Sequence, residues 1–393
     1  MQTMVNEVKD HLEKCIIPFW KELRDDEFGG YYGYLDYNLK LDKSAEKGCI
    51  LNSRILWFFS NVYLLFKDKS LLYEADHAYT YMTEKCLDKE NGGIFWSTTY
   101  DGKVKDSTKH TYNQAFAIYA LSSYYEACGD RNALEKAKEL FYLIESKCKD
   151  EKGYLEASDR YFHKIGNDKL SENGVMADRT MNTLLHVLEA YTGLYRVWKD
   201  DKVKNALKEI LNIFTDKVYN RFLHRQEVFF DDDYKSLIDL HSYGHDIETS
   251  WLVDRAVETV DDPDIEWRDK IHGITEDLSQ NILNTAFDGH SLPNECENGK
   301  VDEKRIWWVQ AETVVGFLNA YLESGRSDVK YLNAARSCLD FIFANLVDKR
   351  DGSEWYWAVD KNGTPINDLP IVEPWKCPYH NGRMCMEVIR RMA

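Results

Sequence analysis

A short segment rich in glycine and aromatic residues recurs six times along this 393-residue chain, and this repetition constrains the fold more than any other feature. The segments are anchored at Gly30, Gly93, Gly153, Glu227, Gly289 and Gly352, so the successive steps are 63, 60, 74, 62 and 63 residues. A repeat of this length is one supersecondary unit, which buries its apolar face only against its neighbours. We therefore expect a single domain over residues 1–393, with an insertion in the repeat that spans 74 residues.

Between successive segments lie about 45 residues, which is room for two helices of ordinary length. The first helix of a pair is apolar almost all round, as in RILWFFSNVYLLF from Arg54, and the second is amphipathic, as in NALEKAKELFYLIESK from Asn132. A helix that is apolar on every side is buried, whereas a helix with one charged face lines the surface. The pairs therefore alternate between an inner and an outer helix.

The two ends of the chain complete this count. Residues 4–23 have helical apolar spacing, and residues 377–392 can supply their inner partner, which gives twelve helices in six pairs. We predict an all-α fold, an (α/α)6 barrel of six inner and six outer helices with short β-hairpins at one rim. An open α-solenoid is the alternative, but the complementary ends favour closure.

Charge and cysteine usage argue against several classes of partner. The formal net charge of −17 argues against binding to nucleic acid or to an anionic membrane, because both need a basic surface. No stretch approaches 18 uninterrupted apolar residues, so we expect no membrane span. The nine scattered cysteines include no CxxC pair, and the charged N-terminal segment has no apolar signal core. We expect a cytoplasmic monomer with free thiols.

Each repeated segment is followed by a cluster of residues suited to a binding or catalytic site. Because the phase between segment and cluster is nearly constant, every cluster is expected to face one shared place at the barrel rim. The clusters are Arg54; Tyr112 and Asn113; Asn182 and His186; His245 and Glu248; Trp307, Trp308 and Glu312; and Trp375 and His380. Three clusters contain a histidine at the start of an inner helix. A single histidine is usually structural, but three at equivalent positions of the repeat indicate a functional role.

These residue types favour proton transfer. Imidazole titrates near pH 6.5 and so can donate or accept a proton at neutral pH. Glu248 lies three residues after His245 on the same helical face, where it can orient the imidazole, and Glu312 lies four residues after Trp308. Each glutamate is equally well interpreted as an ordinary buried hydrogen-bonding group. Arg54 begins an apolar helix, where a charged group needs a partner; we favour stabilisation of an oxyanion over an ion pair with a carboxylate at the rim.

Other chemistries lack their motifs. The run HDIE from His245 looks like half a metal site, but HExxH is absent, and we expect no metal. The sequence has no GxGxxG or GxxxxGK loop and no GxSxG elbow, so we expect neither a nucleotide cofactor nor a serine nucleophile. A glycoside hydrolase needs two carboxylates flanking the scissile bond. The set of His, Arg, Trp and Asn side chains suits proton transfer at a carbon beside a carbonyl better.

Four motifs carry a family resemblance: NSRILWFF from Asn52, SYGHDIE from Ser242, WWVQAE from Trp307 and PWKCPYHNGRMC from Pro374. With them the chain resembles, over nearly its whole length, the cellobiose 2-epimerases, a branch of the N-acylglucosamine 2-epimerase superfamily. The resemblance implies an (α/α)6 barrel that needs no metal or nucleotide. It also implies reversible inversion at C2 of the reducing-end sugar of β-1,4-linked disaccharides, with cellobiose, lactose and mannobiose as expected substrates.

The resemblance also implies roles for individual residues. His245 and His380 resemble the general acid/base pair, His186 resembles the residue that assists ring opening, and Arg54 resembles the group that binds the sugar oxygens. Implied substrate-binding residues are Tyr112, Asp178, Asn182, Glu248, Trp307, Trp308, Glu312 and Trp375. Three alternatives remain open at this point: an aldose–ketose isomerase acting through the same enediolate, a glycoside hydrolase, and a sugar-binding protein without catalysis.

Overall fold

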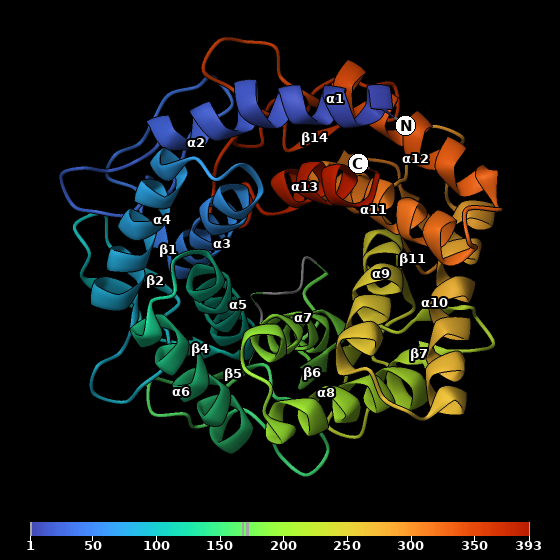
Figure 1. Ribbon diagram of the computed structural model, residues 1–393, viewed down its shortest axis with the longest axis horizontal. Coiled ribbons are helices and arrows are strands. Elements are labelled where there is room, and N and C mark those ends of the chain that lie inside the picture. Colours follow the sequence, from blue (N-terminus) through green and yellow to red (C-terminus); the bar gives the residue numbers. More distant parts are fainter. Residues whose placement is uncertain (1, 167–168, 170–172, 393) are drawn as a thin grey trace.

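Six helices form the inner wall of a closed ring (Figure 1). The computed structural model describes residues 2–166, 169 and 173–392. The inner helices are α3 (Cys49–Phe66), α5 (Thr111–Cys128), α7 (Met181–Val197), α9 (Tyr243–Val260), α11 (Trp307–Glu323) and α13 (His380–Met392). Each contacts the next along the chain, and α13 returns to contact α3. The ring is therefore closed, and the open-solenoid alternative is wrong.

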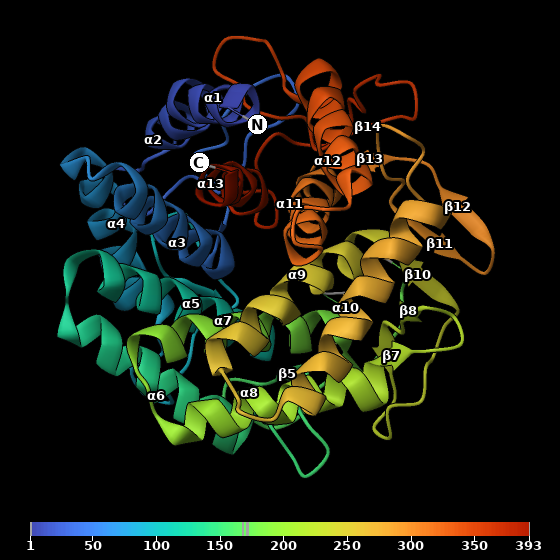
Figure 2. The same ribbon diagram turned by 45° about the vertical axis from the view of Figure 1, so that its right-hand side comes forward.

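A second layer of helices surrounds this ring (Figures 1 and 2). It consists of α1 (Gln2–His11) with α2 (Ile17–Glu22), α4 (Lys69–Tyr81), α6 (Arg131–Lys147), α8 (Asp201–Ile213), α10 (Ile265–Thr285) and α12 (Val329–Phe341). Four single π-helical turns extend these helices: η1 (Leu12–Ile16), η2 (Met82–Cys86), η3 (Phe214–Val218) and η4 (Ile342–Leu346). Because α1 packs against α13, the two chain ends pair as expected, and the predicted (α/α)6 barrel is confirmed.

The two rings differ in burial and capping. Helix α3 is buried on every side from Cys49 to Val62, whereas α8 buries only one stripe, centred on Leu207 and Ile210. Helix α3 is also long and apolar enough to cross a membrane, but 78% of that window is buried inside the barrel. Four outer helices begin at an aspartate whose carboxylate accepts a backbone N–H of the first turn, namely Asp68, Asp130, Asp200 and Asp264.

Short strands occupy one rim of the barrel. They are β1 (Lys47–Gly48), β2 (Ser97–Thr98), β3 (Val104–Asp106), β4 (Lys109–His110), β5 (Ala157–Ser158), β6 (Arg179–Thr180), β7 (Tyr219–Asn220), β8 (Arg225–Gln226), β9 (Phe229–Phe230), β10 (Leu240–Ser242), β11 (Glu295–Glu297), β12 (Lys300–Asp302), β13 (Arg305–Ile306) and β14 (Ala358–Val359). The strand that leads into an inner helix pairs with the glycine-rich segment of the next repeat, as in β1–β2, β4–β5, β6–β9, β10–β11 and β13–β14. Five inner helices thus begin at this rim, each directly after a strand.

The repeated glycine segments have a structural cause. Gly30 and Gly93 adopt φ values of +69° and +76°, and a Cβ on either would lie within 3 Å of an amide oxygen from the adjacent inner helix. At Gly93 that amide belongs to Gln114, which accepts the next backbone N–H, from Ile94. Ion pairs join four of these turns to the strand that follows, as between the buried Asp25 and Lys47 (2.5 Å). Three further pairs repeat the arrangement: Asp88 with Lys109, Asp150 with Arg179, and Asp288 with Arg305.

Candidate active site

A pocket of about 230 Å³ opens at the rim where the inner helices begin. Ten of the twelve predicted site residues line it: Arg54, Tyr112, Asn182, His186, His245, Glu248, Trp307, Trp308, Trp375 and His380. Most lie in the first two turns of an inner helix, and Arg54, His186 and Glu248 each occupy the sixth helical position. Constant phase along the repeat therefore brings distant residues together, as the sequence predicts.

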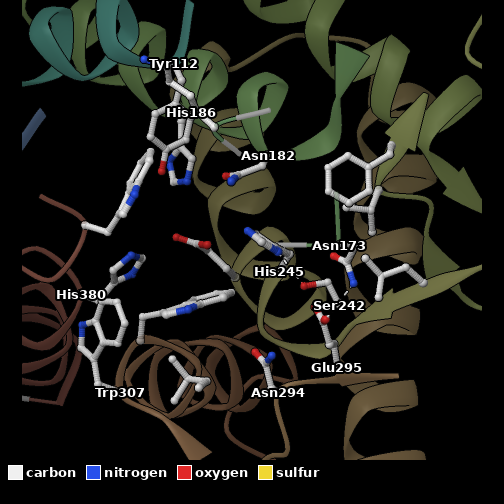
Figure 3. Close-up of a pocket in the computed structure, with 18 of the residues that line it drawn as sticks. Tyr112, Asn173, Asn182, His186, Ser242, His245, Asn294, Glu295, Trp307 and His380 are labelled. Carbon is white, nitrogen blue, oxygen red and sulfur yellow. Dashed lines mark hydrogen bonds between the residues drawn. The ribbon is translucent and has the colours of Figure 1, made fainter. Parts of the chain in front are cut away.

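The three histidines enter this pocket from different walls, and His245 lies between the side of His380 and the side of Ser242 (Figure 3). Each Nδ1 atom has a protein partner. In His186 it bonds to Glu189 Oε2 at 2.9 Å, and in His380 it bonds to Glu312 Oε1 at 2.8 Å. In His245 the partner is a hydroxyl, Ser242 Oγ, at 2.6 Å. Nε2, the other nitrogen of each ring, has no hydrogen bond to the described residues and can act on a ligand in the pocket.

Beneath the histidines lies a buried arginine that the sequence analysis missed. Arg383 is 1% exposed and donates to Glu189 Oε1 at 2.5 Å and to Glu312 Oε1 at 2.7 Å. Arg383 also donates to Glu248. The Tyr379 hydroxyl bonds both to Arg383 and to Glu189. One guanidinium therefore serves three buried carboxylates, two of which hold histidines.

Burial and these charges shift the ionisation of the site. Burial, with a smaller contribution from His186, lowers the pKa of His245 to about 3. Burial also lowers the pKa of His380 well below its ordinary value. Burial and the neighbouring Glu312 carboxylate raise the pKa of Glu248 to about 8. For Glu189 the effect of burial is outweighed by Arg383 and His186, which lower its pKa to about 2. The resting histidines are therefore neutral, and Glu248 binds a proton more readily than an ordinary glutamate does.

Arg54 has no carboxylate partner within ion-pair distance among the described residues. Its Nη2 atom donates to the Tyr112 hydroxyl at 2.7 Å and its Nη1 atom to the Trp375 carbonyl at 3.2 Å. The guanidinium lies over the rings of Phe116 and Tyr379, at 4.2 and 4.7 Å from their centroids. The described part of the chain thus shows no ion pair between Arg54 and a rim carboxylate, and Arg54 lines the pocket with its positive charge.

Several buried polar atoms of the pocket have no hydrogen-bond partner within the part of the chain that the structure describes. They are Arg54 Nε, Asn182 Oδ1, Glu248 Oε2 and Trp307 Nε1. Native proteins rarely leave such atoms unpaired unless a ligand or water completes them. Two donors and two further oxygens around one pocket match a ligand with several hydroxyl groups.

Aromatic rings form the walls of the pocket. The Trp308 ring lies 4.7 Å from the His245 ring and 5.5 Å from the His380 ring, centroid to centroid. Trp375 packs edge-on against Tyr112 at 5.9 Å, and Trp307 packs on Trp357 at 4.6 Å. Flat apolar surfaces beside unpaired polar atoms suit a sugar, whose ring has an apolar face and a hydroxylated edge.

Three expectations need correction. Asp178 does not line the pocket; it forms an ion pair with Lys164 at 2.6 Å, outside the site. Glu312 lies behind the pocket wall, where it accepts hydrogen bonds from His380, Arg383 and Trp251 Nε1. Glu248 bonds to Arg383 and not to His245, so its suggested orienting role passes to Ser242. Glu312 therefore orients a histidine, His380, from a different helix, whereas Glu248 bonds to no histidine in the described structure.

Other pocket residues come from the rim, where the sequence has no helical phase to reveal them. They are Lys169, Asn173, Val228, Phe229, Leu240, Ser242, Asn294, Glu295, Ile306 and Trp357. Lys169 and Asn173 belong to the loop between β5 and β6, which accounts for the long 74-residue step. Asn173 donates to Glu297 at 2.7 Å, which ties this loop to the β11–β12 hairpin.

One group of side chains has the composition of a metal site. A ligand atom from each of Glu248, Glu312 and His380 lies within 4.8 Å of the others. Both carboxylates, however, already accept hydrogen bonds from the guanidinium of Arg383. A divalent ion there would have to displace a buried positive charge, so this donor set fits the arginine better than a metal.

Known proteins resemble this chain along nearly its whole length. Residues 30–381 match the family described as N-acylglucosamine 2-epimerase (GlcNAc 2-epimerase). The chain is 51% identical to a cellobiose 2-epimerase of Eubacterium cellulosolvens, with 98% of each chain covered. A solved sugar epimerase from a ruminal bacterium matches with a TM-score of 0.97 at 49% identity, covering 99% of both chains. The cellobiose 2-epimerase of Bacillus thermoamylovorans B4167 matches with a TM-score of 0.95 at 44% identity, covering 100% of both chains.

Proposed function

Since the chain belongs to the N-acylglucosamine 2-epimerase family, we propose that it epimerises β-1,4-linked disaccharides at C2 of the reducing-end sugar, converting cellobiose to glucosylmannose and back. Lactose and mannobiose are further expected substrates. The observation that carries the proposal is the convergence of His186, His245 and His380 on one pocket with aromatic walls. Relatives named cellobiose 2-epimerase at up to 51% identity support the choice of substrate.

Ring opening comes first, because only the open aldehyde makes the C2–H bond acidic. We assign this step to His186. Its Nδ1 is bonded to Glu189, so Nε2 can move a proton between the anomeric hydroxyl and the ring oxygen. Glu248, whose pKa is raised and whose Oε2 has no partner among the described residues, lines the same pocket and can hydrogen-bond to the sugar.

Proton transfer at C2 follows, and we assign it to His245 and His380. The imidazole whose Nε2 is bare removes the C2 proton and becomes an imidazolium, and the other ring delivers the proton on its own Nε2 to the opposite face of the planar intermediate. Proton transfer through the solvent from the imidazolium to the second ring then restores two neutral imidazoles. Trp308, which lies between the two imidazoles, would support the sugar at the reacting carbon. Rotation about C2–C3 with one base is the alternative route to the same product.

The cis-enediolate intermediate carries negative charge on oxygen. Arg54 is the residue that we assign to this charge, because its Nε–H has no partner in the described part of the chain. The first turns of the inner helices, whose N–H groups give a partial positive charge, lie at the same rim. Preorganised donors of this kind stabilise an oxyanion by about 3–4 kcal/mol each.

The same proposal extends to properties of the whole molecule. We propose that residues 1–393 act as one catalytic domain, without a metal or nucleotide cofactor, in a cytoplasmic monomer. Nine free cysteines support a reducing compartment. The net charge of −17 supports the absence of nucleic-acid and membrane partners.

Product analysis tests this function. The purified protein is incubated with cellobiose in the presence of EDTA, and the reducing-end sugar is identified by NMR. A mannose-configured reducing end is the expected product. A ketose would instead indicate an aldose–ketose isomerase, and free glucose would indicate a hydrolase. If cellobiose stays unchanged, and lactose does too in a second incubation, the protein would be a sugar-binding protein.

A further inference from the structure

We propose that Arg383 is a positioning residue that determines which ring nitrogen of His186 and His380 carries the proton. The inference deepens the proposed function, on which it rests, because it explains how two of the three assigned histidines are kept ready to accept a proton.

The contacts form two short chains that start from one guanidinium. Nη1 of Arg383 donates to Glu189 Oε1, and the other oxygen of Glu189 bonds to Nδ1 of His186 at 2.9 Å. Nη2 donates to Glu312 Oε1, and the same oxygen bonds to Nδ1 of His380 at 2.8 Å. Both carboxylates are at most 4% exposed, so bulk water does not screen their charges.

A buried carboxylate tends to take up a proton unless a positive charge compensates it. Arginine provides that charge because its guanidinium stays protonated in proteins. The compensation matters here, since burial keeps the pKa of Glu312 above its ordinary value and the guanidinium of Arg383, 2.7 Å from Oε1, limits that rise. Without Arg383, Glu312 would keep only the burial that raises its pKa and would become a neutral carboxylic acid.

The protonation state of each carboxylate decides the tautomer of its histidine. An ionised carboxylate only accepts hydrogen bonds, so the imidazole must carry its proton on Nδ1, which leaves Nε2 bare toward the pocket. A neutral carboxyl group can instead donate to Nδ1, and the imidazole then carries its proton on Nε2. In that tautomer the histidine has no lone pair in the pocket and cannot remove a proton from the sugar.

His245 provides an internal reference. Its Nδ1 bonds to the Ser242 hydroxyl at 2.6 Å, and none of the carboxylates on Arg383 bonds to it in the described structure. A hydroxyl both donates and accepts, so it imposes no tautomer through the charge of Arg383. A change at Arg383 should therefore alter His186 and His380 and leave the tautomer of His245 as it is.

Nitrogen NMR of protein labelled with ¹⁵N-histidine tests the inference directly. Wild-type His186 and His380 should show the Nδ1–H tautomer, with assignments from His186→Asn and His380→Asn. In Arg383→Met both signals should change to the Nε2–H tautomer, while that of His245 stays unchanged. Wild-type protein with Nε2–H at His186 and His380 would overturn the proposal, even if the variant does not fold.

Kinetics give the second readout. Arg383→Met should lose about 100-fold or more in kcat, within the usual range for a positioned proton-transfer group, with KM changed less than about threefold. Arg383→Lys, which restores the charge, should recover part of kcat. The matched control is Arg255→Met, because the half-buried Arg255 also forms an ion pair with a buried glutamate, Glu387, and does not line the pocket that holds the histidines. Equal kcat in Arg383→Met and Arg255→Met would refute the positioning role.

The two readouts separate this inference from the proposed function. Wild-type protein that leaves cellobiose unchanged would refute the epimerase proposal, whereas the tautomers of the histidines would still decide the role of Arg383.

Discussion

Replacing His245 with asparagine should make the protein less sensitive to acid. Burial lowers the pKa of His245 to about 3 in the folded protein, whereas an unfolded histidine titrates near 6.5. Between these two pH values the unfolded chain binds a proton that the folded chain does not. The folded state therefore loses stability as the pH falls below 6.5, and the loss continues until the pH reaches the folded pKa.

The size of the effect follows from the shift. At pH 5 the unfolded His245 is almost fully protonated and the folded residue is not, so its contribution is about 2 kcal/mol at 1.4 kcal/mol per pH unit. Part of the ring faces the open pocket. Solvent screening there reduces the expected value to about 1–2 kcal/mol.

Urea unfolding of the wild type and of His245→Asn at pH 7.5 and pH 5.0 measures this contribution. The wild type should lose about 1–2 kcal/mol more than the variant between the two pH values. His163→Asn is the control, because His163 lies exposed on a loop, and it should behave as the wild type does. An equal loss in the wild type and in His245→Asn would refute the account of a neutral, buried His245.

Three further changes test other parts of the site and the fold. His380→Asn should abolish epimerisation while cellobiose still binds, as measured by product analysis and by calorimetry; near-normal turnover would contradict its role as acid or base. Trp375→Ala should raise KM about tenfold or more and change kcat less, since it removes an aromatic wall and no proton-transfer group; an unchanged KM would argue against sugar stacking. Lys47→Met should cost about 3–5 kcal/mol in urea unfolding, because Asp25 stays buried without its 2.5 Å partner; a loss below about 1 kcal/mol would show that the rim ion pairs do not stabilise the ring.

The barrel and most of the pocket could be predicted because the sequence repeats with a nearly constant phase. Apolar helices alternate with amphipathic ones, and residues such as Arg54 and His186 occur at the same position of different inner helices. The resemblance added the roles of the histidines, which no spacing could supply.

The same phase held a signal that the sequence analysis did not use. The residue three positions after each histidine is Glu189, Glu248 or Arg383, and these three charged groups meet beneath the pocket. Only Glu248 was considered in the sequence analysis. The same spacing also predicts that Glu189 and Arg383 lie on the helical face of a site histidine. Asp178 was wrongly predicted to bind the substrate. It precedes its inner helix, and helical periodicity there cannot tell which way a side chain points.

The fate of the C2 hydrogen tests the central claim most directly. Cellobiose is incubated with the enzyme in D2O, and the glucosylmannose formed is examined by NMR and mass spectrometry. Because His245 and His380 are assigned to remove and return the proton, the product should carry one deuterium at C2. A product that retains the original hydrogen at C2 would contradict proton exchange through an enediolate held between these histidines.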